Sequence, residues 1–131
     1  MKTILCIGNI LMQDDGIGIV IGHILRKKGI DCIICETDIA FINEVLNSYD
    51  DVIVVDAVDF NLPAGSSIII PQFEYKPFYN FHHDILFYKY KKITLYGIQV
   101  ESIGININIS KSLRSNLKLY VDEIIKLYNS K

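Results

Sequence analysis

Three groups of polar residues in the sequence carry side chains suited to metal or acid–base chemistry. Asp14 and Asp15 are adjacent in the stretch GNILMQDDGIG, Asp56 ends the apolar run VIVVD, and His82 and His83 are adjacent in FHHDI. Carboxylates and imidazoles bind divalent metal ions and transfer protons near neutral pH. Two carboxylates and one imidazole together predict a three-point metal site with positions left open for substrate. These ligand types exclude a thiolate site but leave nickel, zinc, manganese and iron as alternatives.

Each of these groups also has a purely structural interpretation. Asp14 or Asp15 can cap the helix that follows, because a carboxylate accepts hydrogen bonds from the free N–H groups of a helix N-terminus. A cap explains only one of the two, so we assign Asp14 to fixing the loop and Asp15 to the ligand set. Asp56 at the rim of a buried strand is costly unless its charge is paired or bound, although hydrogen bonding to a neighbouring loop is the alternative. The histidines stand among Phe and Tyr residues, where ordinary packing also accounts for them.

Other chemistries find no support in the sequence. There is no GxSxG elbow, no HExxH helix, no cysteine placed for attack and no GxGxxG spacing. Cys32 and Cys35 have CxxC spacing, but they lie in DCIICE, which is typical of a strand. Side chains three residues apart in a strand point to opposite faces, so we interpret both, and Cys6, as buried packing residues.

The elements that must position these groups alternate along the chain. Apolar runs predict strands at residues 3–8, 31–36, 51–57, 66–71 and 92–98, and helical periodicity predicts helices at residues 15–28, 39–49 and 110–128. Only about ten residues join the third and fourth strands, which is too short for a parallel crossover. We therefore expect a three-layer α/β/α fold with a mixed five-stranded sheet and one antiparallel strand. Ligand sites in such sheets gather at the carboxyl ends of the parallel strands.

Length and charge restrict the partners. The 131 residues predict a single domain over residues 1–131. Thirteen Lys and Arg against fifteen Asp and Glu give a net charge of −2 without a basic stripe, which argues against nucleic acid. The longest apolar run near the start is about half a membrane span and no signal peptide is recognised, so we expect no membrane insertion and a cytoplasmic location.

Four segments resemble one known family, the nickel-iron hydrogenase maturation endopeptidases. These are GNILMQDDGIG, VIVVDAVDFNLPAG, the HHD segment and LYGIQ, which occur in the family's order over residues 4–99. The resemblance implies a nickel-dependent endopeptidase that removes the C-terminal extension of a hydrogenase large-subunit precursor after nickel insertion. It also implies that Asp15, Asp56 and His83 contact the metal, that the substrate carries this nickel, and that other divalent metals can substitute.

The same resemblance implies further roles. Gly8, Asn9, Asp14 and Gly16 match the loop that frames the metal-contacting residues. Nickel that bridges protease and precursor would polarise the scissile carbonyl or lower the pKa of a bound water. The catalytic base would then be Asp15 or Asp56, and the sequence does not choose between them.

The sequence departs from the family after the second predicted strand. Members usually have a Gly-rich turn with Thr or Ser there, whereas this chain has Glu36, Thr37 and Asp38. We predict that these three residues contribute to substrate recognition at the cleft wall. The segment after His83 is short, and the choice of His83 over His82 rests on the match of HD followed by apolar residues.

Two other functions are compatible with part of the pattern. A receiver-like signalling domain binds magnesium with acidic residues after its first strand and an Asp at the end of its third. It places the acidic pair directly on the strand end and a lysine at the end of strand five, where this chain has Gly97, Ile98 and Gln99. The other alternative is a relative that binds a nickel-bearing partner without cleaving it.

Overall fold

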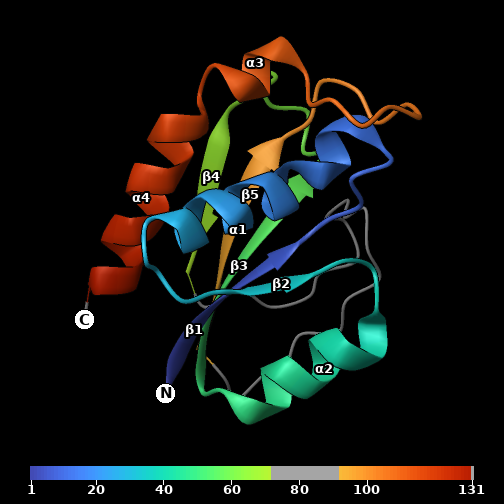
Figure 1. The fold of residues 1–131 in the computed structure, drawn as a ribbon. Helices are drawn as coiled ribbons and strands as arrows, with labels where there is room; N and C mark the ends of the chain where they lie inside the picture. The colour runs from blue at the N-terminus through green and yellow to red at the C-terminus, as the bar shows by residue number, and fades with distance from the viewer. Residues whose placement is uncertain (72–91, 131) are drawn as a thin grey trace.

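A mixed sheet with helices on both faces forms the centre of the molecule (Figure 1). The computed structural model describes residues 1–71 and 92–130, so the predicted ligand His83 and its alternative His82 lie outside the described residues. The elements follow in the order β1 (Lys2–Ile7), η1 (Gln13–Gly16), α1 (Ile17–Lys27), β2 (Ile33–Cys35), α2 (Ile39–Ser48), β3 (Asp51–Val58), β4 (Ser67–Ile70), β5 (Lys92–Gln99), α3 (Lys111–Arg114) and α4 (Leu117–Asn129).

The sheet has the strand order β2-β1-β3-β5-β4. β2, β1, β3 and β5 run parallel, and β4 pairs antiparallel with β5. This confirms the predicted α/β fold with its one antiparallel strand. From β1 the chain passes through α1 to β2 on one side, and then through α2 to β3 on the other side. The direction of winding therefore reverses between β1 and β3.

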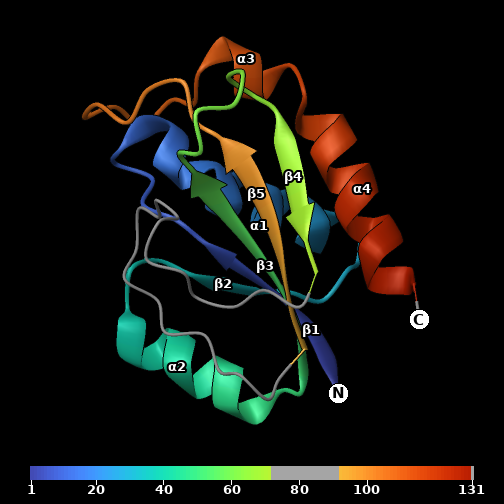
Figure 2. The same ribbon diagram turned by 180° about the vertical axis from the view of Figure 1, so that it is seen from behind.

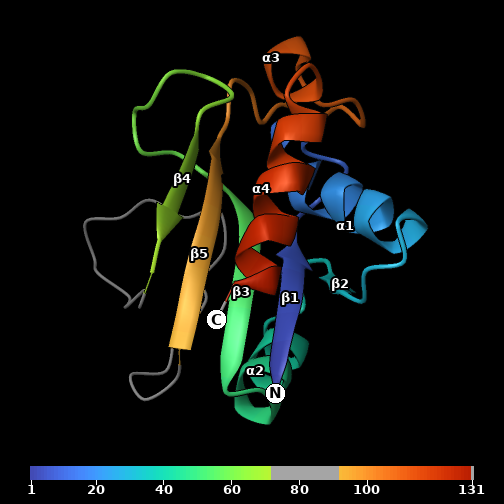
Figure 3. The ribbon, with the colours of Figure 1, turned by 90° about the vertical axis from the view of Figure 1, so that its left-hand side faces the viewer.

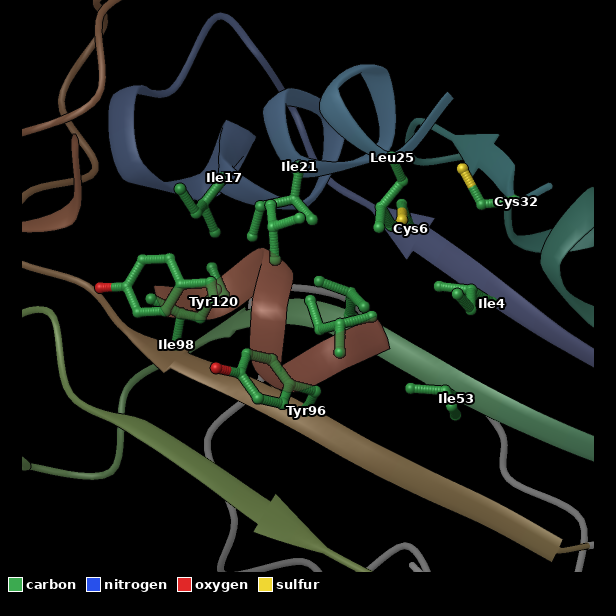
Figure 4. Packing of buried hydrophobic residues seen from close by; sticks show 14 of the residues in the cluster. Ile4, Cys6, Ile17, Ile21, Leu25, Cys32, Ile53, Tyr96, Ile98 and Tyr120 are labelled. Carbon is green, nitrogen blue, oxygen red and sulfur yellow. The ribbon is translucent and has the colours of Figure 1, made fainter. Parts of the chain in front are cut away.

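Two hydrophobic clusters cover the two faces of the sheet. α1 and α4 lie over one face and α2 over the other (Figures 2 and 3). Successive strand residues face opposite sides, so β3 sends Ile53, Val55 and Ala57 into the first cluster and Val52, Val54 and Val58 into the second. The same alternation assigns Asp56 to the α2 face. Figure 4 shows the first cluster, in which the Tyr96 and Tyr120 rings meet edge to face at 6.5 Å between centroids.

Two helices begin or end differently from the prediction. The predicted helix at residues 15–28 starts as the single turn η1, and α1 begins only at Ile17. The predicted C-terminal helix at residues 110–128 is divided into α3 and α4 at Ser115 and Asn116. The Asn116 side chain donates to the Ser112 carbonyl at 3.2 Å. Short polar side chains that bond to nearby backbone in this way compete with helix continuation.

The three cysteines are free and buried, as expected for packing residues. Cys32 belongs to the cluster on the α1 face and Cys35 to the cluster on the α2 face. The CxxC pair is therefore divided between the two sides of the sheet, as the strand pattern predicted. Cys6 lies on the same side as Cys32 (Figure 4).

We expect Cys32 to be the reactive thiol of the folded protein. A hydrogen bond from Cys6 and the nearby Arg26 guanidinium lower the pKa of Cys32 to about 7, against the opposing effect of burial. The same hydrogen bond and burial raise the pKa of Cys6. The rate of alkylation by iodoacetamide should rise with pH around a midpoint near 7, because the thiolate is the nucleophile.

Peptide mapping of the alkylated protein measures this directly. If Cys32 is the thiol that iodoacetamide alkylates fastest, the Cys32→Ser variant should lose this fast phase of alkylation. Cys35→Ser should keep it, because burial raises the pKa of Cys35. A fast phase that survives in Cys32→Ser would contradict the assignment.

Candidate functional site

The carboxyl ends of β1 and β3 form the edge at which the candidate residues meet. Asp14 and Asp15 lie in η1, directly after the loop that leaves β1, and Asp56 lies near the end of β3. This edge is the point where the winding reverses, and open α/β sheets bind their ligands at such points. The fold therefore places the predicted carboxylates at the expected ligand position.

The loop between β1 and η1 folds back on itself. The N–H of Asn9 donates to the Asp15 carbonyl at 3.2 Å, and the Asn9 side chain accepts from the N–H of Leu11 at 3.0 Å. A Cβ at Gly8 would lie 2.5 Å from the Asp15 carbonyl oxygen, so this approach requires glycine. The Gly8 N–H also donates to the carbonyl of Cys35 at 3.3 Å. These contacts hold the backbone of Asp15 close to the end of β1, which lies beside the end of β2.

Asp14 is fully buried and holds a second loop against the first. Its carboxylate accepts from the N–H groups of Glu101 at 2.8 Å, Ser102 at 2.9 Å and Ser110 at 2.6 Å, and from the Ser110 hydroxyl at 2.8 Å. Its own N–H donates to the Ser102 carbonyl at 3.1 Å. Both carboxylate oxygens of Asp14 are thus engaged inside the protein, and the residue joins the loop after β1 to the loop after β5.

The start of α1 packs against the ends of the two strands that Asp15 and Asp56 adjoin. A Cβ at Gly18 would lie 2.1 Å from the carbonyl oxygen of Ile7 and 2.9 Å from that of Val55. The first turn of α1 therefore rests directly on the ends of β1 and β3, and η1 also packs against β3. Asp15 precedes this contact and Asp56 follows Val55. Both carboxylates are buried, with 3% and 1% of their residue surface exposed.

Asp56 lies opposite a glycine of the neighbouring strand. One carboxylate oxygen accepts from the N–H of Ala57 at 2.8 Å. On β5 the residue in register with Asp56 is Gly97, which adds no side chain next to it. A Cβ at Gly97 would meet side-chain carbons of Val58 at 2.8 Å and Ile68 at 3.2 Å.

We predict that Gly18→Ala destabilises the fold by about 2 kcal/mol, because an added methyl group must push α1 away from two backbone carbonyls. Urea denaturation measures the change. Gly104→Ala is the matched control, because a Cβ there meets nothing nearer than 3.7 Å, and it should shift the free energy of unfolding by less than about 0.5 kcal/mol. Equal stabilities of the two variants would show that α1 does not depend on this close approach.

Gln99 is a further residue of the site edge to which the sequence assigned no role. It is buried at the end of β5, and its side-chain oxygen accepts from the N–H groups of Phe60 at 2.9 Å and Leu62 at 3.2 Å. Its side-chain nitrogen donates to Asp59 at 3.1 Å. Gln99 therefore fixes the loop that follows Asp56 and β3. The available signal was an amide at the end of an otherwise apolar strand.

Glu36, Thr37 and Asp38 are exposed and follow β2 at the same edge of the sheet. The Asp38 carboxylate accepts from the N–H of Phe41 at 3.2 Å and caps the N-terminus of α2. This hydrogen bond gives Asp38 a structural role. The predicted contribution of the three residues to substrate recognition stays a prediction.

The described residues contain two of the three predicted metal ligands. Within residues 1–71 and 92–130 no three His, Cys, Asp or Glu side chains are grouped as a metal site, and the third predicted ligand, His83, lies outside these ranges. Asp15 and Asp56 are buried carboxylates at the same end of the sheet, and carboxylate oxygens are ligands that divalent cations accept. The imidazole that would complete the predicted nickel site belongs to His83.

Comparison with solved structures identifies the architecture. A [NiFe] hydrogenase maturation protease, HybD from Thermococcus kodakarensis, superimposes with a TM-score of 0.81 over 98% of this chain and 99% of its own, at 23% sequence identity. The fold is that of the hydrogenase maturation proteases. HycI of the same organism matches with a TM-score of 0.75 and 20% identity over 98% of this chain and 92% of its own. The hydrogenase maturating endopeptidase HybD from E. coli matches with a TM-score of 0.70 and 18% identity over 96% of this chain and 90% of its own.

No model of a protein family matches the sequence, and no curated protein sequence matches it. The antiparallel β4 also separates this hydrogenase maturation protease fold from the all-parallel doubly wound sheet of receiver domains. In the part of the chain that the structure describes, no helix has the length and apolar character needed to cross a bilayer.

Proposed function

We propose that this protein is an endopeptidase that removes the C-terminal extension of a nickel-iron hydrogenase large-subunit precursor after nickel has been inserted. The observation that supports this proposal most strongly is the position of Asp15 and Asp56, two buried carboxylates after β1 and near the end of β3, where the winding of this fold reverses. Open α/β sheets bind their ligands at this position. Carboxylates supply oxygen ligands to metal ions and accept protons, which are the two roles that metal-assisted hydrolysis of a peptide bond requires.

In this proposal Asp15, Asp56 and His83 hold the nickel that belongs to the substrate. The ion supplies Lewis acidity toward the scissile carbonyl, as zinc, manganese or iron would. Asp15 or Asp56 accepts a proton from the attacking water as its oxygen bonds to the carbonyl carbon. The peptide C–N bond then breaks, and the same carboxylate returns the proton to the leaving amine.

The local structure favours this use of Asp15 over Asp14. The four hydrogen bonds to the Asp14 carboxylate all come from the loop between β5 and α3, and they make Asp14 a fixed anchor between that loop and η1. Asp15 follows it in the same turn, where its position is set by the Asn9 to Asp15 backbone bond. A rigid first residue and a ligand beside it explain why two acidic residues stand together.

The proposal is tested by mixing the protein with nickel-loaded precursor and following loss of a C-terminal peptide by mass spectrometry. Cleavage should require nickel in the precursor and should be lost in His83→Ala, whereas His82→Ala should retain most of it. If only His82→Ala loses activity, His82 and not His83 is the metal-contacting histidine. Tight binding of the nickel-loaded precursor without any cleavage would replace the endopeptidase with a nickel-partner binding protein.

A further inference from the structure

Two loops beside the candidate site expose apolar side chains on one surface. Figures 1 and 2 show the loop after β1 next to the loop after β5. We call this surface the isoleucine platform, and its members are Ile10, Leu11, Met12, Ile103, Ile105 and Ile107. Ile105 is 96% exposed, Ile107 71% and Leu11 59%. Single exposed apolar residues are ordinary, but a group of six on two adjoining loops marks an interaction surface.

The platform is held in place by backbone hydrogen bonds between the two loops. Met12 and Asn106 form a parallel bridge, in which the Gln13 N–H donates to the Asn106 carbonyl at 2.7 Å and the Asn106 N–H donates to the Leu11 carbonyl at 3.0 Å. The buried Asp14 carboxylate fixes the base of both loops. The isoleucines are therefore presented on an ordered support, which lowers the entropy lost when a partner binds.

The chemistry of the platform specifies an uncharged, extended partner. No charged residue occurs at positions 8–13 or 102–110. The stretch IGININI alternates apolar and polar residues as a half-buried strand does, yet Ile105 and Ile107 point into solvent. An uncharged segment of this kind is prone to aggregate unless something covers it. A partner segment with apolar side chains is the ligand that would bury these residues.

The size and position of the platform indicate which partner this is. Six side chains are far fewer than the roughly 20 residues that each subunit contributes to a standard protein interface, so the platform suits a peptide segment better than a second copy of the chain. Met12 is three Cα–Cα steps from Asp15, a span of at most about 11 Å. A segment bound on the platform therefore lies close to the candidate site.

We propose that the isoleucine platform binds an extended apolar segment of the hydrogenase large-subunit precursor next to the bond that is cut. This inference rests on the proposed endopeptidase function. The platform supplies affinity that is the same in the ground and transition states, so its loss should raise KM and leave kcat nearly unchanged. The carboxylate that acts as general base affects kcat instead.

The double variant I105S/I107S tests this inference with nickel-loaded precursor as substrate. We expect KM to rise at least ten-fold, kcat to stay within two-fold of the wild type, and the urea denaturation midpoint to stay unchanged, because both side chains are exposed in the free protein. Leu119→Ser is the matched control, since Leu119 is an exposed apolar residue of α4 with 53% of its surface accessible, and it should leave KM unaltered.

The outcomes separate the two proposals. A wild-type protein that cuts the precursor, with an unchanged KM in I105S/I107S, overturns the platform assignment and leaves the endopeptidase standing. A wild-type protein that does not cut the precursor overturns both. A change of sedimentation coefficient in I105S/I107S at unchanged KM identifies a second copy of this chain as the occupant and also overturns the inference.

Discussion

The Asp15→Asn and Asp56→Asn variants are each expected to lower kcat/KM for cleavage of nickel-loaded precursor by about a thousand-fold. Asparagine keeps the size of the side chain and its oxygen acceptor, so the Ala57 N–H can still donate to position 56. It loses the negative charge that attracts the cation and the basic oxygen that takes a proton from water. Progress curves followed by mass spectrometry measure the loss, and urea denaturation verifies that the variants are folded.

The two possible roles of each carboxylate give different results. If the carboxylate is a metal ligand, its loss should lower the affinity for nickel-loaded precursor, whereas if it is the general base, its loss should lower kcat at unaltered affinity. Asp31→Asn is the control, because Asp31 is an exposed carboxylate before β2, at the opposite edge of the sheet. If either site variant has the kcat/KM of the wild type, its carboxylate takes no part in the reaction.

The sheet could be predicted because its determinants are local. Four consecutive apolar residues before Asp56 mark a strand that is buried on both faces, and a connection of about ten residues before β4 leaves no room for a crossover helix. The division of the C-terminal helix could not be seen in the same way. Leu113 and Tyr120 are both buried, so the apolar spacing looks the same with or without a break at Ser115 and Asn116.

The candidate site was also predictable only in part from the sequence. The places of Asp15 and Asp56 follow from the rule that parallel strands bring their carboxyl ends to one edge. The partners of Asp14 lie 87 to 96 residues further along the chain, and three of its four hydrogen bonds come from backbone N–H groups. Every residue except proline has such a group, so these partners leave no mark in the residue pattern. The same applies to Gln99, whose oxygen also accepts from backbone N–H groups.

Removal of the Asp14 carboxylate, which joins the loop after β1 to the loop after β5, has the largest expected effect on stability. We predict that Asp14→Ala lowers the free energy of unfolding by about 3 to 5 kcal/mol, because it leaves the buried N–H of Ser110 and the part-buried N–H of Ser102 without their charged acceptor. Urea denaturation at fixed pH measures this change. Ser110→Ala removes only the hydroxyl from the same network, and its expected cost is about 1 kcal/mol.

Stability and substrate binding should be linked through this residue. Since Asp14 fixes the base of both loops, Asp14→Ala should also raise KM for the precursor, whereas Ser110→Ala should leave KM close to the wild-type value. The comparison is made at a temperature where both variants are fully folded. A fully folded Asp14→Ala protein with wild-type stability and wild-type KM would show that the loops associate without the carboxylate, and that Asp14 serves neither the fold nor the platform.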